Sequence, residues 1–245
     1  MTRTLISVCT YNELQNIRLL IPELRQVAPA ADVLIVDDSS PDGTGDVVKE
    51  MAATDSAVRL MSRSGKLGLG SANLEAFRYA IREGYDLLVN LDADFSHPPQ
   101  VIPALIALTN TCDVAIGSRY VPGGAAVGWS LWRHFMSRAV NLYARLFLGL
   151  TSRDNSGSFR CYRVSCLDRI DWGRTLSTGY SFYEEVLYRC RQAGCSFAET
   201  PIIFEDRRFG ETKLKTIEIL KAVWVIFRLG LQRMRGVSVL KNQDT

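Results

Sequence analysis

Short apolar runs alternate with amphipathic helical patterns over the first half of the sequence, and this alternation narrows the possible folds more than any other feature. It predicts strands and helices in turn at 4–9, 13–27, 32–36, 45–53, 58–61, 70–83, 87–91, 99–108 and 113–117. Strands that alternate with helices indicate a mainly parallel sheet with right-handed crossovers, flanked by helices. The predicted fold class is therefore α/β, of the Rossmann-like kind.

The pattern changes after Arg119. Turn-forming composition predicts loops at 121–128 and 154–158. Between and after them we expect helices at 130–148 and 183–192, a strand at 197–204, and a long helix at 214–234. Because no repeat or linker interrupts the chain, we expect one α/β domain over 1–213, followed by an amphipathic helical extension over 214–245.

Composition excludes several classes of protein. A net charge of +3 does not by itself indicate nucleic acid, and none is expected as a partner. The six cysteines form no Cys-x-x-Cys and only two histidines occur, which argues against structural zinc. We expect reduced thiols and a cytoplasmic protein. No apolar run approaches the roughly 18 residues that span a bilayer.

Two carboxylates, Asp92 and Asp94, follow the strand predicted at 87–91. Side chains at i and i+2 of an extended segment point the same way, and ligands bind at the carboxyl ends of strands in open α/β sheets. Hard oxygen ligands of this kind hold Mg²⁺ or Mn²⁺ and leave positions for phosphate oxygens. A solvated loop with two acids is the alternative, because a lone Asp-x-Asp is a weak motif.

Polar clusters at 10–13 and 37–43 end two further strands, which favours a polar pocket at one sheet edge. Asp38 resembles a ribose or base contact in a nucleotide site, although 40–43 also reads as a Ser-Pro-Asp-Gly turn. The Gly-rich stretch at 65–70 precedes a helix and suits an anion, with a flexible turn as the alternative.

These motifs occur together in a fixed order, over about residues 4–215, with Gly117-Ser118-Arg119-Tyr120 and the stretch 206–213 after them. The joint pattern resembles the family 2 glycosyltransferases of the GT-A fold, and among them the dolichol-phosphate (polyprenol-phosphate) mannose synthases. The resemblance implies a catalytic domain that transfers mannose, with inversion, from GDP-mannose to a polyprenyl or dolichyl monophosphate, with Mg²⁺ or Mn²⁺ as cofactor.

The resemblance also implies roles for matching residues. The nucleotide sugar would be held by Thr10, Tyr11, Glu13, Val36, Asp38, Lys66, Asp92 and Glu185. The metal would be held by Asp94, with Ser96 and Asp92. The acceptor phosphate would be held by Arg119, Arg133 and Ser137, and the donor phosphates would be covered by Arg207 and Lys213. For Glu185, which would orient the sugar hydroxyls, an exposed helix face is the alternative.

The sequence departs from the family pattern at Cys9, where relatives often have Pro, and at 156–158, where Ser-Gly-Ser replaces Thr-Ser-Gly or Thr-Gly-Gly. We expect it to resemble the short, single-domain members of the family, without the trailing transmembrane helices of many relatives. The chemistry is consistent with Asp, Arg and Lys and no placed His. An acceptor phosphate is already ionised, whereas the leaving diphosphate needs charge stabilisation.

The helices at 130–148 and 217–234 mix large apolar with basic residues, as interfacial helices do. A helix packed on the protein's own core is the alternative for both. We expect peripheral contact with the cytosolic face of a membrane through the second helix, by insertion of Trp224, Ile226, Phe227 and Leu231. Three alternatives remain open. These are a related transferase using another sugar nucleotide such as UDP-glucose, a receiver-like signalling domain, and an inactive nucleotide-sugar-binding protein.

Overall fold

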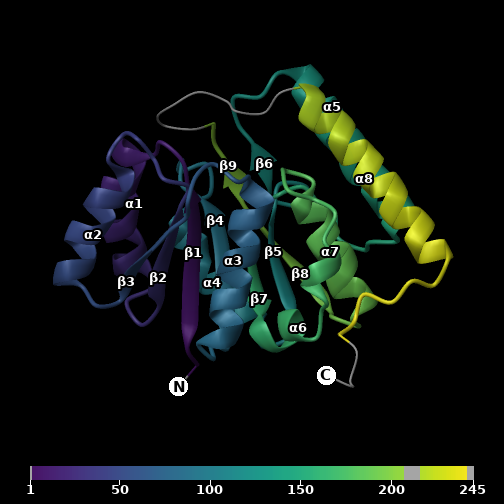
Figure 1. Ribbon diagram of the computed structural model, residues 1–245. Coiled ribbons are helices and arrows are strands. Elements are labelled where there is room, and N and C mark those ends of the chain that lie inside the picture. The colour runs from purple at the N-terminus through teal and green to yellow at the C-terminus, as the bar shows by residue number, and fades with distance from the viewer. Residues whose placement is uncertain (1, 207–215, 242–245) are drawn as a thin grey trace.

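A seven-stranded sheet with helices on both faces forms the centre of the computed structural model, which describes residues 2–206 and 216–241 (Figure 1). The strand order is β3-β2-β1-β4-β7-β5-β8, and β7 alone runs antiparallel to its neighbours in this sheet. The strands are β1 (Thr4–Thr10), β2 (Asp32–Asp37), β3 (Val58–Ser62), β4 (Leu87–Asp92), β5 (Val114–Ser118), β7 (Arg160–Arg163) and β8 (Phe197–Pro201). The predicted mainly parallel α/β sheet is confirmed.

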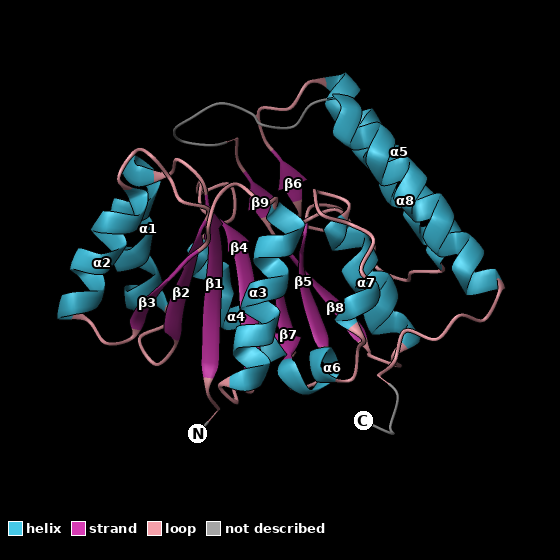
Figure 2. Cartoon of the chain, viewed as in Figure 1, coloured by secondary structure: helices cyan, strands magenta, loops and turns pink. Residues whose placement is uncertain are grey.

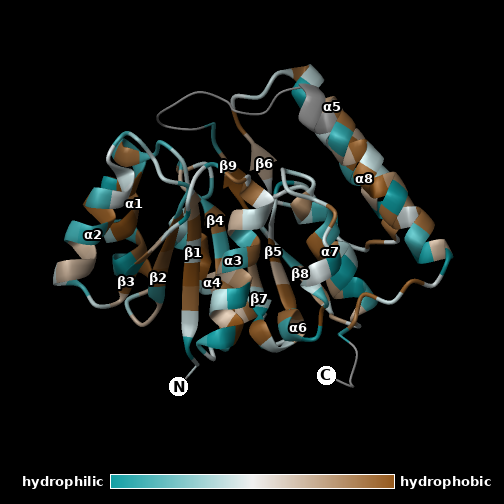
Figure 3. Ribbon diagram, in the orientation of Figure 1, coloured by the Kyte–Doolittle hydropathy of each residue, from teal (hydrophilic) through white to brown (hydrophobic). Residues whose placement is uncertain are grey.

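The helices cover the two faces of the sheet (Figure 2). They are α1 (Leu14–Val27), α2 (Thr44–Thr54), α3 (Leu69–Arg82), α4 (Ile102–Leu108), α5 (Leu131–Leu148), α6 (Val164–Asp168), α7 (Phe182–Gln192) and α8 (Thr216–Met234). Successive strand residues serve opposite faces: in β2, Leu34 and Val36 join one hydrophobic cluster, whereas Val33 and Ile35 join the other. Burial on both faces explains the continuous apolar runs, coloured brown in Figure 3.

Three strands and one short helix depart from the expected pattern. β7 reads Arg-Cys-Tyr-Arg, carries no apolar run, and is inserted between β4 and β5, while α6 follows it directly. The strand expected at 197–204 is divided at Ile202 into β8 and β9 (Ile203–Phe204). β9 pairs with β6 (Ala125–Ala126), which lies inside the Gly-rich segment expected to be a loop. Pairing of such short segments depends on tertiary neighbours more than on local composition.

α5 and α8 pack side by side at one end of the molecule (Figures 1 and 2). Val225, Ile226 and Leu229 of α8 are buried in the hydrophobic cluster that includes α7. The expectation that Ile226 enters a membrane is therefore wrong, because its side chain is fully buried against the protein. Trp224 and Phe227 are exposed, as that expectation requires. Within the described residues, no helix is both long and apolar enough to cross a bilayer.

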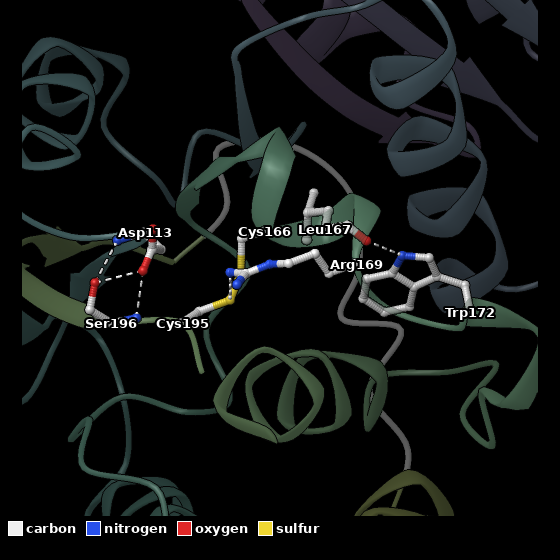
Figure 4. The surroundings of a disulfide bond; sticks show 7 residues. All are labelled: Asp113, Cys166, Leu167, Arg169, Trp172, Cys195 and Ser196. Carbon is white, nitrogen blue, oxygen red and sulfur yellow. Dashed lines mark hydrogen bonds between the residues drawn. A yellow bond between two sulfur atoms is a disulfide. The ribbon is translucent and has the colours of Figure 1, made fainter. Parts of the chain in front are cut away.

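A disulfide joins Cys166, on α6, to Cys195, in the turn before β8 (Figure 4). The two Cα atoms are 6.4 Å apart although the residues are separated by 29 positions in sequence. The expectation of reduced thiols is wrong for this pair, because folding buries both side chains in the same hydrophobic cluster. Cys9, Cys112, Cys161 and Cys190 are free.

Candidate functional site

The carboxyl ends of β1, β2 and β4 meet around a cavity of about 590 Å³. Register explains the convergence, since Thr10 lies opposite Asp37 and Cys9 lies opposite Asp92. The cavity brings together residues from each of the three predicted polar clusters, together with the Gly-rich stretch. Those predicted to bind a nucleotide sugar or metal and found in its lining are Thr10, Tyr11, Glu13, Asp38, Lys66, Asp92 and Asp94.

The backbone is strained at each of these strand ends. Asn12, Ser39 and Phe95 have positive φ angles of 57°, 54° and 62°, and each follows closely on β1, β2 or β4. A left-handed conformation is unfavourable for residues with a Cβ, and such strain gathers at ligand-binding sites where the surrounding structure imposes it. The loops are therefore held in set shapes around the cavity.

Asp38 is buried and tied to the loop that follows β3. Its Oδ1 accepts a hydrogen bond from Arg63 Nη1 at 2.6 Å, and its Oδ2 accepts one from the Leu67 N–H at 3.1 Å. Lys66, beside it, places its ammonium 4.2 Å from the centre of the Tyr11 ring, a cation–π contact. Val36 does not reach the cavity, because its side chain is fully buried in the core. The pairing of Arg63 with Asp38 was not predicted from the sequence.

The Asp92–Asp94 pair is organised by its neighbours. Asp94 is 9% exposed, and its Oδ1 accepts hydrogen bonds from the Ser96 N–H and hydroxyl at 3.1 and 2.6 Å. Asp92 Oδ1 accepts one from the Ser158 hydroxyl at 2.8 Å. Ser96 is itself buried and does not line the cavity. Its described role is to donate hydrogen bonds to Asp94.

His97 lies beneath Asp92, although no placed histidine was expected. Its Nδ1 accepts the Asp92 N–H at 3.2 Å, and its ring stacks on Phe159 with centroids 5.2 Å apart. Burial lowers the pKa of His97, which keeps the imidazole neutral and able to accept this hydrogen bond. The hydrophobic pattern of the sequence does not predict this contact of His97 with Asp92, because the contact depends on the turn at Phe95.

The loop 176–181 forms another wall of the cavity and was not predicted as part of it. Gly68 and Gly70 meet it closely: a Cβ on Gly68 would lie 2.7 Å from the Thr178 carbonyl oxygen, and the Gly70 N–H donates to that oxygen at 2.9 Å. The Gly-rich stretch therefore permits close backbone approach. From α8, Lys221, Trp224 and Val225 complete the lining.

Glu185 lies beneath this loop, with its side chain fully buried. Its carboxylate accepts hydrogen bonds from the N–H groups of Leu176 and Ser177, at 2.8 to 3.1 Å, and from Arg189 at 2.7 and 2.9 Å. The alternative of an exposed helix face is wrong. Glu185 therefore holds the loop that forms the cavity wall, and it does not itself line the cavity.

The predicted acceptor residues lie together beside a tryptophan. Arg119 and Arg133 have their guanidinium carbons 5.2 and 4.2 Å from the centre of the Trp129 ring. The Ser137 hydroxyl accepts a hydrogen bond from the Tyr120 hydroxyl at 2.6 Å. Arg133 also pairs with Asp206 at 3.2 Å. These residues form a second group, distinct from the lining of the cavity.

Asp154 holds Arg119 in place, a pairing that sequence reasoning missed. Nε and Nη2 of Arg119 donate to its two carboxylate oxygens at 2.7 and 2.6 Å, and both side chains are buried. Burial by itself raises the pKa of the Asp154 carboxyl, but the charge and hydrogen bonds of Arg119 outweigh it and hold this pKa below its ordinary value. Through Ser158, the same loop also reaches Asp92.

Glu184 is buried nearby, and its Oε2 has no hydrogen-bond partner within the described part of the chain. Burial raises the pKa of this carboxyl to about 7. Arg160, fully buried on β7, donates to the Tyr183 and Asn155 carbonyl oxygens at 2.7 Å each. The predicted residues Arg207 and Lys213 lie outside the described residues.

The donor set suits a hard divalent cation. Asp92 and Asp94 both line the cavity, so their carboxylate oxygens face one space. Oxygen ligands of this kind bind Mg²⁺ and Mn²⁺, whereas soft metals prefer sulfur. The free thiol nearby, Cys9, does not change this, because burial strongly raises its pKa and keeps it protonated.

Comparison with known proteins agrees with this geometry. The model of the family described as Glycosyl transferase family 2 matches residues 5–171. The undecaprenyl-phosphate mannosyltransferase of Micrococcus luteus is 42% identical over 229 residues, which are 94% of each chain. The polyprenol monophosphomannose synthase of Mycolicibacterium smegmatis is 39% identical over 241 residues, 96% of this chain and 91% of that one. The interpretation as a signalling receiver domain is therefore wrong.

Solved structures share the fold. Glucosyl-3-phosphoglycerate synthase from Mycobacterium tuberculosis, in complex with Mn²⁺, UDP and glucosyl-3-phosphoglycerate, superposes with a TM-score of 0.63 at 17% identity. The match covers 99% of this chain and 82% of that chain. At this identity the likeness establishes the GT-A fold alone.

Proposed function

The chain belongs to glycosyltransferase family 2, and from this premise we propose that it transfers mannose from GDP-mannose to a polyprenyl monophosphate, with inversion, giving polyprenyl-phosphate mannose. The mannosyltransferases of Micrococcus luteus and Mycolicibacterium smegmatis support this sugar and this acceptor class. The observation that carries the proposal is the meeting of Asp38, Asp92 and Asp94 in one cavity, beside the paired arginines Arg119 and Arg133.

In this proposal the donor occupies the cavity. Thr10, Tyr11, Glu13 and Asp38 bind the nucleoside, and Lys66 lies at its edge. Val36 contributes through its backbone, since its side chain is in the core. Glu185 acts by holding the loop 176–181, and Arg207 and Lys213 cover the diphosphate. Residues 1–213 form the catalytic domain, while the extension 214–245 supplies one wall through Trp224.

A divalent metal, Mg²⁺ or Mn²⁺, fits the two carboxylates, and a solved relative of the same fold holds Mn²⁺. When bound, the metal stabilises the charge that develops on the leaving diphosphate. Asp94 is its main ligand, Asp92 a second one, and Ser96 fixes the carboxylate of Asp94 by donating to its Oδ1.

The acceptor phosphate binds between Arg119 and Arg133, near Ser137. Asp154 and Ser156 bind Nε and Nη2 of Arg119, so its Nη1 is the atom that faces a phosphate in this proposal. Charge-assisted hydrogen bonds of this kind orient an anion strongly. Because a phosphate monoester is ionised at neutral pH, no general base is required, which agrees with the neutral, buried His97.

The acceptor lipid also requires a site close to a bilayer. Exposed large apolar residues gather on α5 and α8, and they include Trp132, Phe135, Trp224 and Phe227. We therefore propose peripheral contact through both helices. We propose that this contact is with the cytosolic face of the membrane.

The test is transfer of radiolabelled sugar to a polyprenyl phosphate, with GDP-mannose and UDP-glucose compared at equal concentration. We expect a labelled lipid with GDP-mannose and none with UDP-glucose. A chelator should abolish this transfer, and Mn²⁺ or Mg²⁺ should restore it. Transfer from UDP-glucose would identify the related glucosyltransferase. Binding of either nucleotide sugar without transfer under both metals would indicate an inactive binding protein.

A further inference from the structure

A second cavity, of about 640 Å³, lies between α5 and the segment 119–124. It shares none of its described lining residues with the donor cavity. Its lining contains four arginines and no acidic residue: Arg119, Arg138, Arg145 and Arg153. The cavity is therefore strongly basic, and through Arg119 it adjoins the proposed acceptor-phosphate site.

Among the described residues, a carboxylate neutralises one of these four guanidinium groups. Arg119 is bound by Asp154, as described above. Within the described residues, the guanidinium groups of Arg138, Arg145 and Arg153 form no ion pair or hydrogen bond. The nearby carboxylate of Glu199 accepts hydrogen bonds from the backbone N–H groups of Arg153 and Asp154, at 2.8 and 3.0 Å. Three unpaired guanidinium groups around one cavity are complementary to an anion.

The cavity opens beside an apolar helix surface. Arg138, Leu142 and Arg145 follow one another at helical spacings on α5, and all three contribute to the lining. Leu131, Phe135, Leu142 and Leu146 of the same helix are 89%, 62%, 54% and 69% exposed. Alternation of guanidinium groups with exposed large apolar side chains matches the boundary between lipid headgroups and acyl chains.

We propose that this cavity binds the phosphate of an anionic membrane phospholipid, whose acyl chains lie along the exposed surface of α5. The anion is supplied by the bilayer rather than by the acceptor. The proposed acceptor phosphate lies between Arg119 and Arg133. Arg119 also lines this second cavity, whereas Arg138, Arg145 and Arg153 are not used by the acceptor and can hold a second phosphate. The site anchors the enzyme and sets its orientation. It rests on the proposed bilayer contact, but not on the identity of the donor.

The first experiment measures binding of the full chain to vesicles of phosphatidylcholine with and without phosphatidylglycerol, with no donor or acceptor present. The Arg138→Gln, Arg145→Gln, Arg153→Gln triple variant should lose about 100-fold in partition to the anionic vesicles, as expected for three basic residues at such a surface. The corresponding triple Lys variant keeps the charge and should retain binding.

The matched control removes three exposed arginines elsewhere, by Arg18→Gln, Arg78→Gln and Arg82→Gln on α1 and α3. These charges lie away from α5, so partition should change by less than about threefold. Equal losses in the two Gln triples, or none in the first, would overturn the cavity assignment. If the wild-type protein binds neither kind of vesicle, the bilayer contact in the proposed function is wrong as well.

The second experiment separates the sources of phosphate. Calorimetric titration with short-chain phosphatidylglycerol below its micellar concentration should show binding by wild type and none by the first triple variant. Inorganic phosphate at the same concentrations should not bind, and equally tight binding would instead make this a free-anion site. The KM for polyprenyl phosphate in detergent should differ less than about twofold between wild type and the first triple Gln variant. In detergent there is no anionic bilayer surface for the three arginines to bind. A large rise in this KM would place the acceptor in the cavity and refute the phospholipid.

Discussion

Asp94 combines near-complete burial with hydrogen bonds that aim its carboxylate, and so it is the residue on which metal binding should depend most. Asp94→Asn keeps the shape and the Ser96 contacts but removes the charge. We expect turnover to fall by about 10³-fold or more, comparable to the loss of a main electrostatic contact with a leaving group. Initial rates over a Mn²⁺ titration measure this.

The control is Asp46→Asn on α2, an exposed carboxylate paired with Lys49. It should leave both activity and metal dependence unchanged. Full activity of Asp94→Asn at saturating Mn²⁺ would remove Asp94 from the metal site.

Glu184 predicts a pH dependence of stability. Burial raises its folded-state pKa to about 7 from an ordinary value of 4.5, so the folded protein holds a proton that the unfolded chain releases. Stability is therefore lost as pH rises from about 4.5 to about 7 and is not regained above. Glu184→Gln should be more stable than wild type at pH 8, by up to about 3 kcal/mol, and nearly equal to it at pH 4.5.

Urea unfolding at both pH values measures the difference. Glu50→Gln, on the exposed surface of α2, should show wild-type behaviour throughout. Parallel stability curves for wild type and Glu184→Gln would show that this carboxyl has an ordinary pKa in the folded protein.

At the scale of elements, the loop 176–181 is a cavity wall without a secondary structure of its own, and α7 holds it through Glu185. Glu185→Gln weakens the acceptance of the two backbone N–H groups and the pairing with Arg189. We expect the donor Kd to rise about tenfold, because one charged hydrogen-bonding partner is worth roughly 1.5–3 kcal/mol. The acceptor KM should stay unchanged.

Direct contact of Glu185 with the sugar predicts another result. The kcat would then fall while the calorimetric Kd of GDP, which carries no sugar, stayed at the wild-type value. A rise in the Kd of GDP itself supports the positioning role, since only the wall of the nucleotide site is altered.

At the scale of the whole molecule, α5 and α8 form one layer whose outer surface carries large apolar side chains. Trp224 is a poor probe of membrane contact, because it also lines the donor cavity. Trp132 and Phe135, on α5, are 68% and 62% exposed and do not line it. Trp132→Glu with Phe135→Glu should release the protein from vesicles and slow transfer to a long lipid, while a short soluble acceptor reacts normally.

Flotation with vesicles and assays on the two acceptors measure these effects. Leu19→Glu, at a comparably exposed apolar residue of α1, should bind vesicles like wild type. If the double variant floats with the vesicles, α5 does not insert, and α8 becomes the remaining candidate.

The sequence alone determined the parallel sheet and the convergence of its acidic strand ends on one cavity, because both follow from local patterns. Alternating strands and helices require crossovers, and the carboxyl ends of parallel strands share an edge, so Asp38, Asp92 and Asp94 had to come near one another. The strands β1, β2 and β4 are mostly apolar and end at the polar residues Thr10, Asp37 and Asp92, which made their ends recognisable in the sequence.

Only the tertiary structure decided which distant residues meet. Asp154 binds Arg119 across 35 positions, Cys166 joins Cys195 across 29, and β7 enters the sheet between strands far from it in sequence. Such pairs cannot be predicted from the hydrophobic pattern of the sequence. They depend on which helices and strands, distant in sequence, pack together in the folded protein. For the same reason α8 was read as a membrane helix: its hydrophobic pattern is the same whether a bilayer or the protein's own core buries Ile226.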